Sequence, residues 1–173
     1  MSVAVIETER LILRSYTTQD AEMAYTFLSD PITMSFWSNP LNREQALNWV
    51  NRSMEQEREY GYGRWLVLLK ETGTVIGDCG LLRSEINGQL ENDLGYILHH
   101  SYWKQGYAVE AAQACLNYGL SPLKLDSICT NMPFDHTASR RVSEKIGMEF
   151  ELAFINKKNR DIRTLLYRKI NQA

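Results

Sequence analysis

The hydrophobic pattern of the N-terminal third changes from a strand-like to a helical one. Residues 9–16 (ERLILRSY) alternate between apolar and polar positions, which predicts a strand. A helix is predicted over 17–30, because threonines stand at its start, acidic residues lie in its first turn and Pro31 follows its end. Apolar residues at helical spacing, with a glycine as stop, predict a second helix over 42–61. The segment between these helices, 35–40 (SFWSNP), is predicted to be a loop that carries two aromatic side chains.

The middle of the chain has the pattern of consecutive strands. Residues 64–83 predict two strands joined across Glu71–Thr74. The Asn87-Gly88 pair is typical of a tight hairpin turn, and a third strand is predicted over 90–99. Residues 94–98 of this strand are apolar on both faces, as expected of a central strand.

The last third alternates helices with strands. Small residues form a helical stripe over 107–119, which allows this helix to lie very close to a sheet. A strand over 124–132, a short helix over 136–147 and strands over 148–155 and 162–170 follow. The order β-α-α-β-β-β-α-β-α-β-β predicts an α/β fold with a mixed sheet that is not doubly wound, because three consecutive strands are joined by hairpins.

Composition and length favour one globular domain over residues 1–173. Hydrophobic residues make up 44% of the chain and charged residues 23%, and the sequence has no internal repeat or low-complexity linker. A net charge of −2 gives no reason to expect nucleic acid or an anionic membrane as a partner. The N-terminus lacks the pattern of a signal peptide and no run has the length of a membrane span, so a cytoplasmic location is expected.

The cysteines and histidines indicate neither disulfides nor a metal site. The three cysteines (Cys79, Cys115 and Cys129) lie far apart and are expected to be reduced, buried thiols. The three histidines (His99, His100 and His136) do not have zinc-site spacing, so no metal is expected.

Gly106 stands at the opening of the helix predicted over 107–119, immediately after an apolar strand. The N-terminus of a helix presents unpaired amides and the positive end of its dipole, which together bind anions. Gly106 and Ala108 leave room for a phosphate to approach these amides, and Lys104 adds positive charge. The alternative is that Gly106 only relieves crowding at a strand-to-helix turn.

Two motifs resemble those of a known superfamily. The segment DLGYILHHSYWKQGYAVEA (93–111) resembles the signature of the GNAT superfamily of N-acetyltransferases, whose [QR]-x-x-G-x-[GA] loop holds the pyrophosphate of acetyl-CoA. HTASRRVSEKIGMEF (136–150) resembles the superfamily's N-x-x-S…EK-x-G-[FM] helix, and ETERLILR and VIGDCGL occur in the usual order. The resemblance extends from about residue 7 to the C-terminus and is nearest to the branch of ribosomal-protein alanine N-acetyltransferases. It implies a GNAT-like, mostly antiparallel central sheet flanked by helices, acetyl-CoA as cosubstrate without a metal, and transfer of acetyl to a primary amine.

The resemblance also implies which residues bind the cosubstrate. The pyrophosphate would lie at the loop formed by Lys104, Gln105, Gly106, Tyr107 and Ala108. The pantetheine arm would pair with the backbone of Ile97 and Leu98, as a further strand would.

Three residues of the helix motif are candidates for contacts with the cosubstrate or for catalysis. His136 stands where the motif has asparagine and Ser139 at its serine, so both are candidates to contact the pantetheine; capping of the helix is the preferred interpretation of His136. Ser143 stands where many relatives carry the tyrosine that protonates the leaving thiolate, and a solvent-facing serine is the preferred interpretation.

Acetyl transfer to an amine also needs a base and an acceptor pocket. Asp93 and Glu91 precede the apolar part of the central strand, and either carboxylate can accept an ammonium proton, Asp93 being preferred; ordinary solvated charges are the alternative. Phe36, Trp37 and Trp65 are candidates to line the acceptor pocket, although aromatic residues more often belong to the core; Trp37, in the proline-bounded loop 35–40, is the preferred one.

The acceptor is left open by the sequence. A protein N-terminus is one candidate, and polyamines or antibiotics are another. A non-catalytic module that only binds CoA is a third interpretation. A monomer or a homodimer without nucleic-acid or membrane partners is expected.

Overall fold

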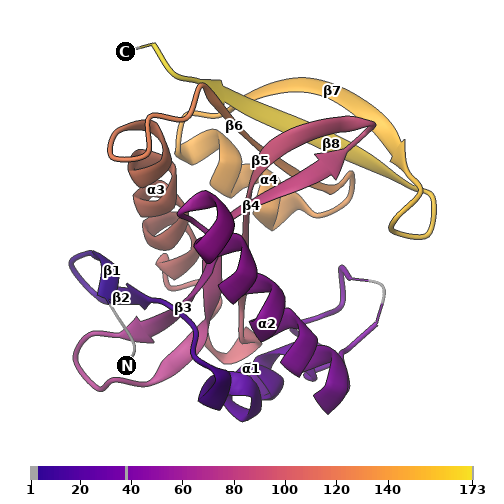
Figure 1. Cartoon of the computed structure of the whole chain (residues 1–173). Coiled ribbons are helices and arrows are strands. Elements are labelled where there is room, and N and C mark those ends of the chain that lie inside the picture. The colour runs from indigo at the N-terminus through magenta and orange to yellow at the C-terminus, as the bar shows by residue number, and fades with distance from the viewer. Residues whose placement is uncertain (1–3, 38, 173) are drawn as a thin grey trace.

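A single eight-stranded sheet forms the centre of the molecule in the computed structural model, which describes residues 4–37 and 39–172 (Figure 1). The strand order is β1-β2-β3-β4-β5-β6-β8-β7, and all neighbours are antiparallel except β5 and β6, which are parallel. The predicted mixed, mostly antiparallel sheet is therefore confirmed. None of the helices in these residues is long and apolar enough to cross a membrane.

The strands are β1 (Ala4–Glu7), β2 (Leu11–Arg14), β3 (Arg64–Leu69), β4 (Val75–Ile86), β5 (Gln89–Leu98), β6 (Ser127–Pro133), β7 (Glu149–Asn156) and β8 (Ile162–Ile170). The helices are α1 (Ala21–Leu28), α2 (Arg43–Tyr60), α3 (Tyr107–Leu120) and α4 (Thr137–Lys145), with short 3₁₀ helices at Thr18–Asp20 and His100–Tyr102. Among the described residues, β1 is the one strand that the pattern does not predict; it forms at the edge of the sheet by pairing with β2.

Two hydrophobic cores cover opposite faces of the sheet. Successive residues of a strand point to opposite faces, and along β3 Trp65 and Val67 pack in the core that contains α3, whereas Leu66 and Leu68 pack with α1 and α2. Trp65 is fully buried in the α3 core. It is therefore a core residue rather than a wall of the acceptor pocket.

The ends of α2 are fixed by the residues that the sequence places there. The Asn42 side chain accepts a hydrogen bond from the Gln45 backbone, and the Gln45 side chain accepts one from the Asn42 backbone. Gly61 ends the helix with a φ of 83°, a conformation that glycine adopts without strain. These caps set where α2 begins and ends beneath the sheet.

The sheet divides between β5 and β6. The two strands pair only at Asp93 and Cys129, although β5 pairs with β4 over its whole length. Residues 94–98 of β5 therefore have a strand partner on one side only. This division positions the candidate site.

Candidate active site

A cavity of about 780 Å³ lies where β5 and β6 part. Residues 93–96 of β5 and 130–133 of β6 form its floor, while α2 and the segment between α1 and α2 form one wall and α4 with the β7–β8 turn forms another. Five of the site residues predicted from the sequence line this cavity: Phe36, Trp37, Asp93, His136 and Ser139.

Asp93 is the predicted carboxylate that lines the cavity. The register with β4 is regular, so Asp93 shares a face with Gly95 and Ile97, which is the face covered by α1 and α2. Burial raises the pKa of Asp93 to about 7, against the lowering effects of Arg64 and of a 3.3 Å hydrogen bond from Asn131 Nδ2. A carboxyl with this pKa is about half ionised at neutral pH and can accept a proton there.

Glu91 has a different environment two residues earlier on the same strand. Both of its carboxylate oxygens accept hydrogen bonds from the Arg168 guanidinium, each at 2.8 Å. This hydrogen-bonded pairing holds the pKa of Glu91 below its usual value. A carboxylate committed to a bidentate arginine is a poor proton acceptor, so the structure favours Asp93 over Glu91 as the base.

Tyr96 lines the same cavity and was not singled out by sequence reasoning. It lies on the opposite face of β5 from Asp93, packed against the α3 core and interacting with the Ser139 side chain. Burial raises the pKa of Tyr96 to about 12, so its hydroxyl keeps its proton at neutral pH. The sequence DLGY (93–96) could have indicated Tyr96, because a spacing of three residues places Asp93 and Tyr96 on opposite faces of one strand.

Ser143 does not face solvent, contrary to the preferred interpretation. Its side chain is buried in α4, and its hydroxyl donates to the backbone carbonyl of Ser139 at 3.2 Å. This bond to the preceding turn is the usual one for a serine inside a helix. Ser139, by contrast, lines the cavity.

His136 occupies the N-cap position of α4, but its side chain makes no capping hydrogen bond, so the capping interpretation is wrong. The ring stacks on Phe36 instead, with centroids 3.7 Å apart and planes 6° apart. Burial lowers the pKa of His136 to about 4, and its buried Nδ1 has no hydrogen-bond partner among the described residues. The neutral ring thus joins α4 to the segment between α1 and α2 across the cavity.

Trp37 lies beside Phe36 in the predicted loop and remains 40% exposed. Its ring meets the edge of Trp49 from α2 at a centroid distance of 5.9 Å. The Trp49 Nε1 atom in turn donates to the fully buried Asp78 carboxylate at 2.7 Å. An anchored partner beneath an exposed indole is a suitable arrangement for a wall that contacts a ligand.

The loop before α3 turns sharply. Lys104 and Gly106 have φ angles of 62° and 83°, and Gly106 is the N-cap residue of α3. Arg10, which sequence reasoning did not identify as a site residue, supports this loop: its Nη1 donates to the Gln105 carbonyl at 2.9 Å and its guanidinium lies 4.4 Å from the Tyr107 ring centroid. The Nε of Arg10 is also ion-paired with Glu110 at 2.7 Å, so its charge is largely balanced within the protein and its part is to hold the loop in shape.

Ile97 and Leu98 end β5 between this loop and the cavity. Both are buried and pair on one side with Asp78 and Gly77 of β4. The Leu98 carbonyl accepts a hydrogen bond from Trp103 Nε1 at 2.8 Å, which ties the strand end to the turn before α3. The end of β5 and the loop before α3 are thus held together by this hydrogen bond.

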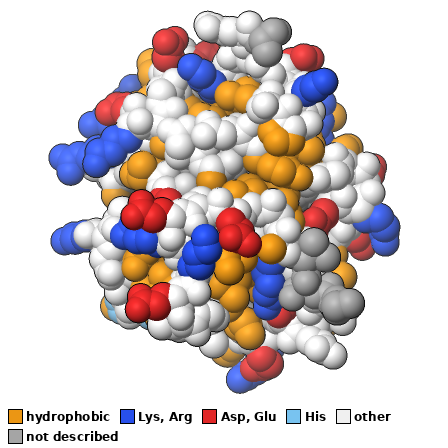
Figure 2. All heavy atoms as spheres, turned by 90° about the vertical axis from the view of Figure 1, so that its left-hand side faces the viewer, with side chains coloured by type: hydrophobic (Ala, Val, Ile, Leu, Met, Phe, Trp, Pro, Cys, Tyr) orange, Lys and Arg blue, Asp and Glu red, His pale blue; other side chains and the backbone are white. Residues whose placement is uncertain are grey.

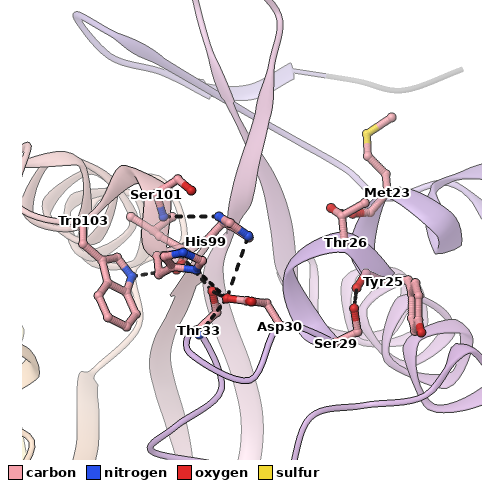
Figure 3. Close-up of polar contacts among 11 residues, drawn as sticks. Met23, Tyr25, Thr26, Ser29, Asp30, Thr33, His99, Ser101 and Trp103 are labelled. Atoms are coloured by element: carbon pink, nitrogen blue, oxygen red, sulfur yellow. Dashed lines mark hydrogen bonds and ion pairs between the residues drawn. The ribbon is translucent and has the colours of Figure 1, made fainter.

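A cluster of His99, His100 and Asp30 lies at the end of β5 (Figure 3), and its ligand-type atoms are within 4.8 Å of one another. His100 Nδ1 lies 2.6 Å from Asp30 Oδ2, which also accepts from the Thr33 amide and hydroxyl. His99 Nδ1 accepts from the Ser101 amide, so the neutral ring carries its proton on Nε2, 3.8 Å from the same oxygen. A metal on Nε2 would require the proton on Nδ1, where it would face the Ser101 N–H. These contacts therefore favour a hydrogen-bonded link between the residues that follow β5 and the segment after α1.

A second hollow, of about 670 Å³, lies on the face shown in Figure 2, between β1 and α3. Val5, Ile6, Val109 and Tyr118 are among its lining residues, and hydrophobic side chains are visible between charged ones across this face. Its charged residues are Glu7 and Glu110, and Glu110 is already bound to Arg10 at 2.7 Å. The predicted catalytic residues all lie elsewhere, which leaves the cavity between β5 and β6 as the candidate active site.

Comparison with known proteins identifies the family and the fold. Residues 10–149 match the family model of the acetyltransferase (GNAT) domain. The uncharacterized N-acetyltransferase p20 of Bacillus licheniformis is 30% identical over 147 residues, which cover 83% of this chain and 82% of that protein. A GNAT-family acetyltransferase from Bacillus anthracis has a TM-score of 0.81 at 27% identity, with 100% of both chains covered. The ribosomal L7/L12 alpha-N-protein acetyltransferase RimL, in complex with coenzyme A, has a TM-score of 0.80 at 15% identity, covering 97% of this chain and 98% of that one, and shares the fold.

Proposed function

Because the chain belongs to the GNAT acetyltransferase family, we propose that it moves the acetyl group of acetyl-CoA to a primary amine in the cavity between β5 and β6. The observation that carries this proposal is the placement of Asp93 and Tyr96. They lie on opposite faces of β5, one ionisable near pH 7 and the other protonated, beside the point where β5 loses its β6 partner.

The free side of β5 and the loop before α3 fit acetyl-CoA. The backbone of Ile97 and Leu98 would bind the pantetheine arm, with His136 and Ser139 on the α4 side of the cleft. The amides of residues 104–108 and the Lys104 cation would bind the pyrophosphate, while Arg10 holds the loop through the Gln105 carbonyl. Acetyl-CoA would supply an activated thioester there, and backbone N–H groups of β5 would donate hydrogen bonds to its carbonyl oxygen.

Asp93 would accept the proton of the acceptor ammonium, because only a neutral amine attacks a thioester. Its pKa near 7 suits this role: the carboxyl is ionised often enough to take a proton and basic enough to hold it. Its position on the α1–α2 face puts it beside the wall formed by Phe36 and Trp37, where the acceptor would lie.

Tyr96 would supply the proton that the leaving sulfur needs. Ser143 was the candidate acid in the sequence, but its hydroxyl donates to the Ser139 carbonyl, so Tyr96 is the better candidate for this role. Tyr96 projects toward the α3–α4 face, so the base and the acid would act from opposite faces of one strand.

A protein N-terminal amine is one acceptor to test, since RimL is named as an alpha-N-protein acetyltransferase. Small amines are the second candidate. Release of CoA thiol from acetyl-CoA, measured with N-terminal peptides and with small amines, tests the proposal. Amine-dependent release by the wild-type protein and its loss in Asp93→Asn are expected; CoA binding without amine-dependent release from any acceptor would instead favour the non-catalytic interpretation.

A further inference from the structure

The charged side chains that line the cavity are mainly basic. Arg52, Arg64, Lys157 and Lys158 face two acidic residues, Glu85 and Asp93. Asp93 is only partly ionised near neutral pH, which increases the excess of positive charge. A positively charged site disfavours a polycationic acceptor.

Two of the basic groups have partners in the protein. Arg64 is buried, and its Nε lies 3.5 Å from Asp78 Oδ1. Asp78 is fixed by hydrogen bonds from Tyr16 Oη and Trp49 Nε1, both at 2.7 Å. Lys158 Nζ donates to the backbone carbonyl of Glu85 at 2.9 Å, which keeps its charge on the β4 side of the cavity.

Arg52 differs from these groups. It lies three residues after Trp49 on α2, and both side chains line the cavity, as residues at this spacing share a helix face. Within residues 4–37 and 39–172, it has no ion pair or side-chain hydrogen bond. Its charge nevertheless acts on Asp93, whose pKa it lowers. An unpaired guanidinium thus lies close enough to influence the proposed base.

We propose that the acceptor is a primary amine with a carboxylate a few bonds away, and that Arg52 binds this carboxylate while the amine lies at Asp93; this rests on the proposed function. A guanidinium binds a planar carboxylate through paired hydrogen bonds. The acceptor class is therefore amino acids or short acidic N-termini, in contrast to polyamines and other polycations.

Acceptors with the same amine test this choice. Kinetics of thiol release are measured with the dipeptide amides Ala-Glu, Ala-Gln and Ala-Lys and with spermidine. Free alanine is compared with alaninamide, and both rates are corrected for the ionised fraction of the amine. We expect kcat/KM to be about ten-fold higher for each carboxylate acceptor than for its neutral partner, and lowest for the cations. The dipeptide and amino-acid arms distinguish a peptide from a free amino acid as the source of the carboxylate.

Arg52→Gln is expected to remove this preference by raising KM for the carboxylate acceptors, in addition to a smaller change shared by all acceptors because the pKa of Asp93 rises. Arg52→Lys should retain part of the preference. Arg58→Gln, on an exposed position of the same helix, is the matched control and should leave the preference unchanged. Thiol release that favours neutral or cationic amines, or an equal effect of Arg52→Gln on every acceptor, would overturn the inference but keep the proposed function. No amine-dependent release from any acceptor would overturn both.

Discussion

Replacing Asp93 with asparagine keeps the shape of the side chain and removes its basicity. If the carboxylate accepts the ammonium proton, kcat/KM at pH 7 should fall by about 10²–10⁴-fold. A pKa of about 7 means that the ionised fraction of Asp93 rises from about one tenth at pH 6 to about nine tenths at pH 8. The ratio of wild-type to variant rates should therefore grow about ten-fold over this range, and taking the ratio cancels the ionisation of the acceptor amine itself.

Asp93→Asn should lower activity but raise the stability of the folded protein at high pH. The folded pKa of Asp93 lies above its ordinary value of 3.8, so the protonated form is favoured in the folded state. Its contribution to stability is present below pH 4 and is lost as the pH rises through 7. A difference of about three pKa units corresponds to about 4 kcal/mol at most, and Asp93→Asn should recover part of this at pH 8.

Thiol-release kinetics between pH 6 and 8 and thermal unfolding at pH 5 and 8 provide the two measurements. Asp126→Asn makes the same chemical change at an exposed position before β6 and controls for loss of charge. A folded Asp93→Asn protein with the wild-type rate at pH 7 would refute the role of Asp93 as base. A variant that loses activity without a pH-dependent ratio would indicate a structural role instead.

Three further substitutions test the rest of the site. Gly106→Asp should weaken CoA binding at least ten-fold, because it places a carboxylate at the loop. The control Gly61→Asp, at a glycine with the same φ of 83° in open space, should lower only stability, by about 1–2 kcal/mol in calorimetry. Equal CoA affinity in the two variants would refute the anion site. Tyr96→Phe should lower kcat by about 10–100-fold with little change in KM, while the exposed Tyr60→Phe should not, and an unchanged kcat would exclude Tyr96 as the acid. Trp37→Ala should raise KM for the acceptor more than for acetyl-CoA in steady-state kinetics; equal effects together with lower stability would identify Trp37 as structural.

Local patterns predicted most of the fold because they act over short distances. Asn42 and Gly61 fix the ends of α2 through bonds within one turn, and the apolar stretch of β5 fixes its burial. The division between β5 and β6 could not be predicted in this way. It depends on the register of a parallel pair whose partners, Asp93 and Cys129, are far apart in sequence.

The candidate site was only partly predictable for the same reason. Glu91 and Asp93 look alike in the sequence, and Arg168 from β8 distinguishes them. His136 looks like a helix cap until Phe36, 100 residues earlier, is seen to stack on its ring. Tyr96 has an apolar setting in the sequence, and its neighbour Ser139 comes from a different element. In each case the deciding contact is long-range.

A crystal structure of the protein with CoA tests the central claim most directly, namely that the division between β5 and β6 is where the cosubstrate binds and reacts. The account predicts the pantetheine arm against the backbone of Ile97 and Leu98, the pyrophosphate at the amides of residues 104–108, and the thiol end between Asp93 and Tyr96. CoA bound elsewhere, for example in the hollow between β1 and α3, would contradict it.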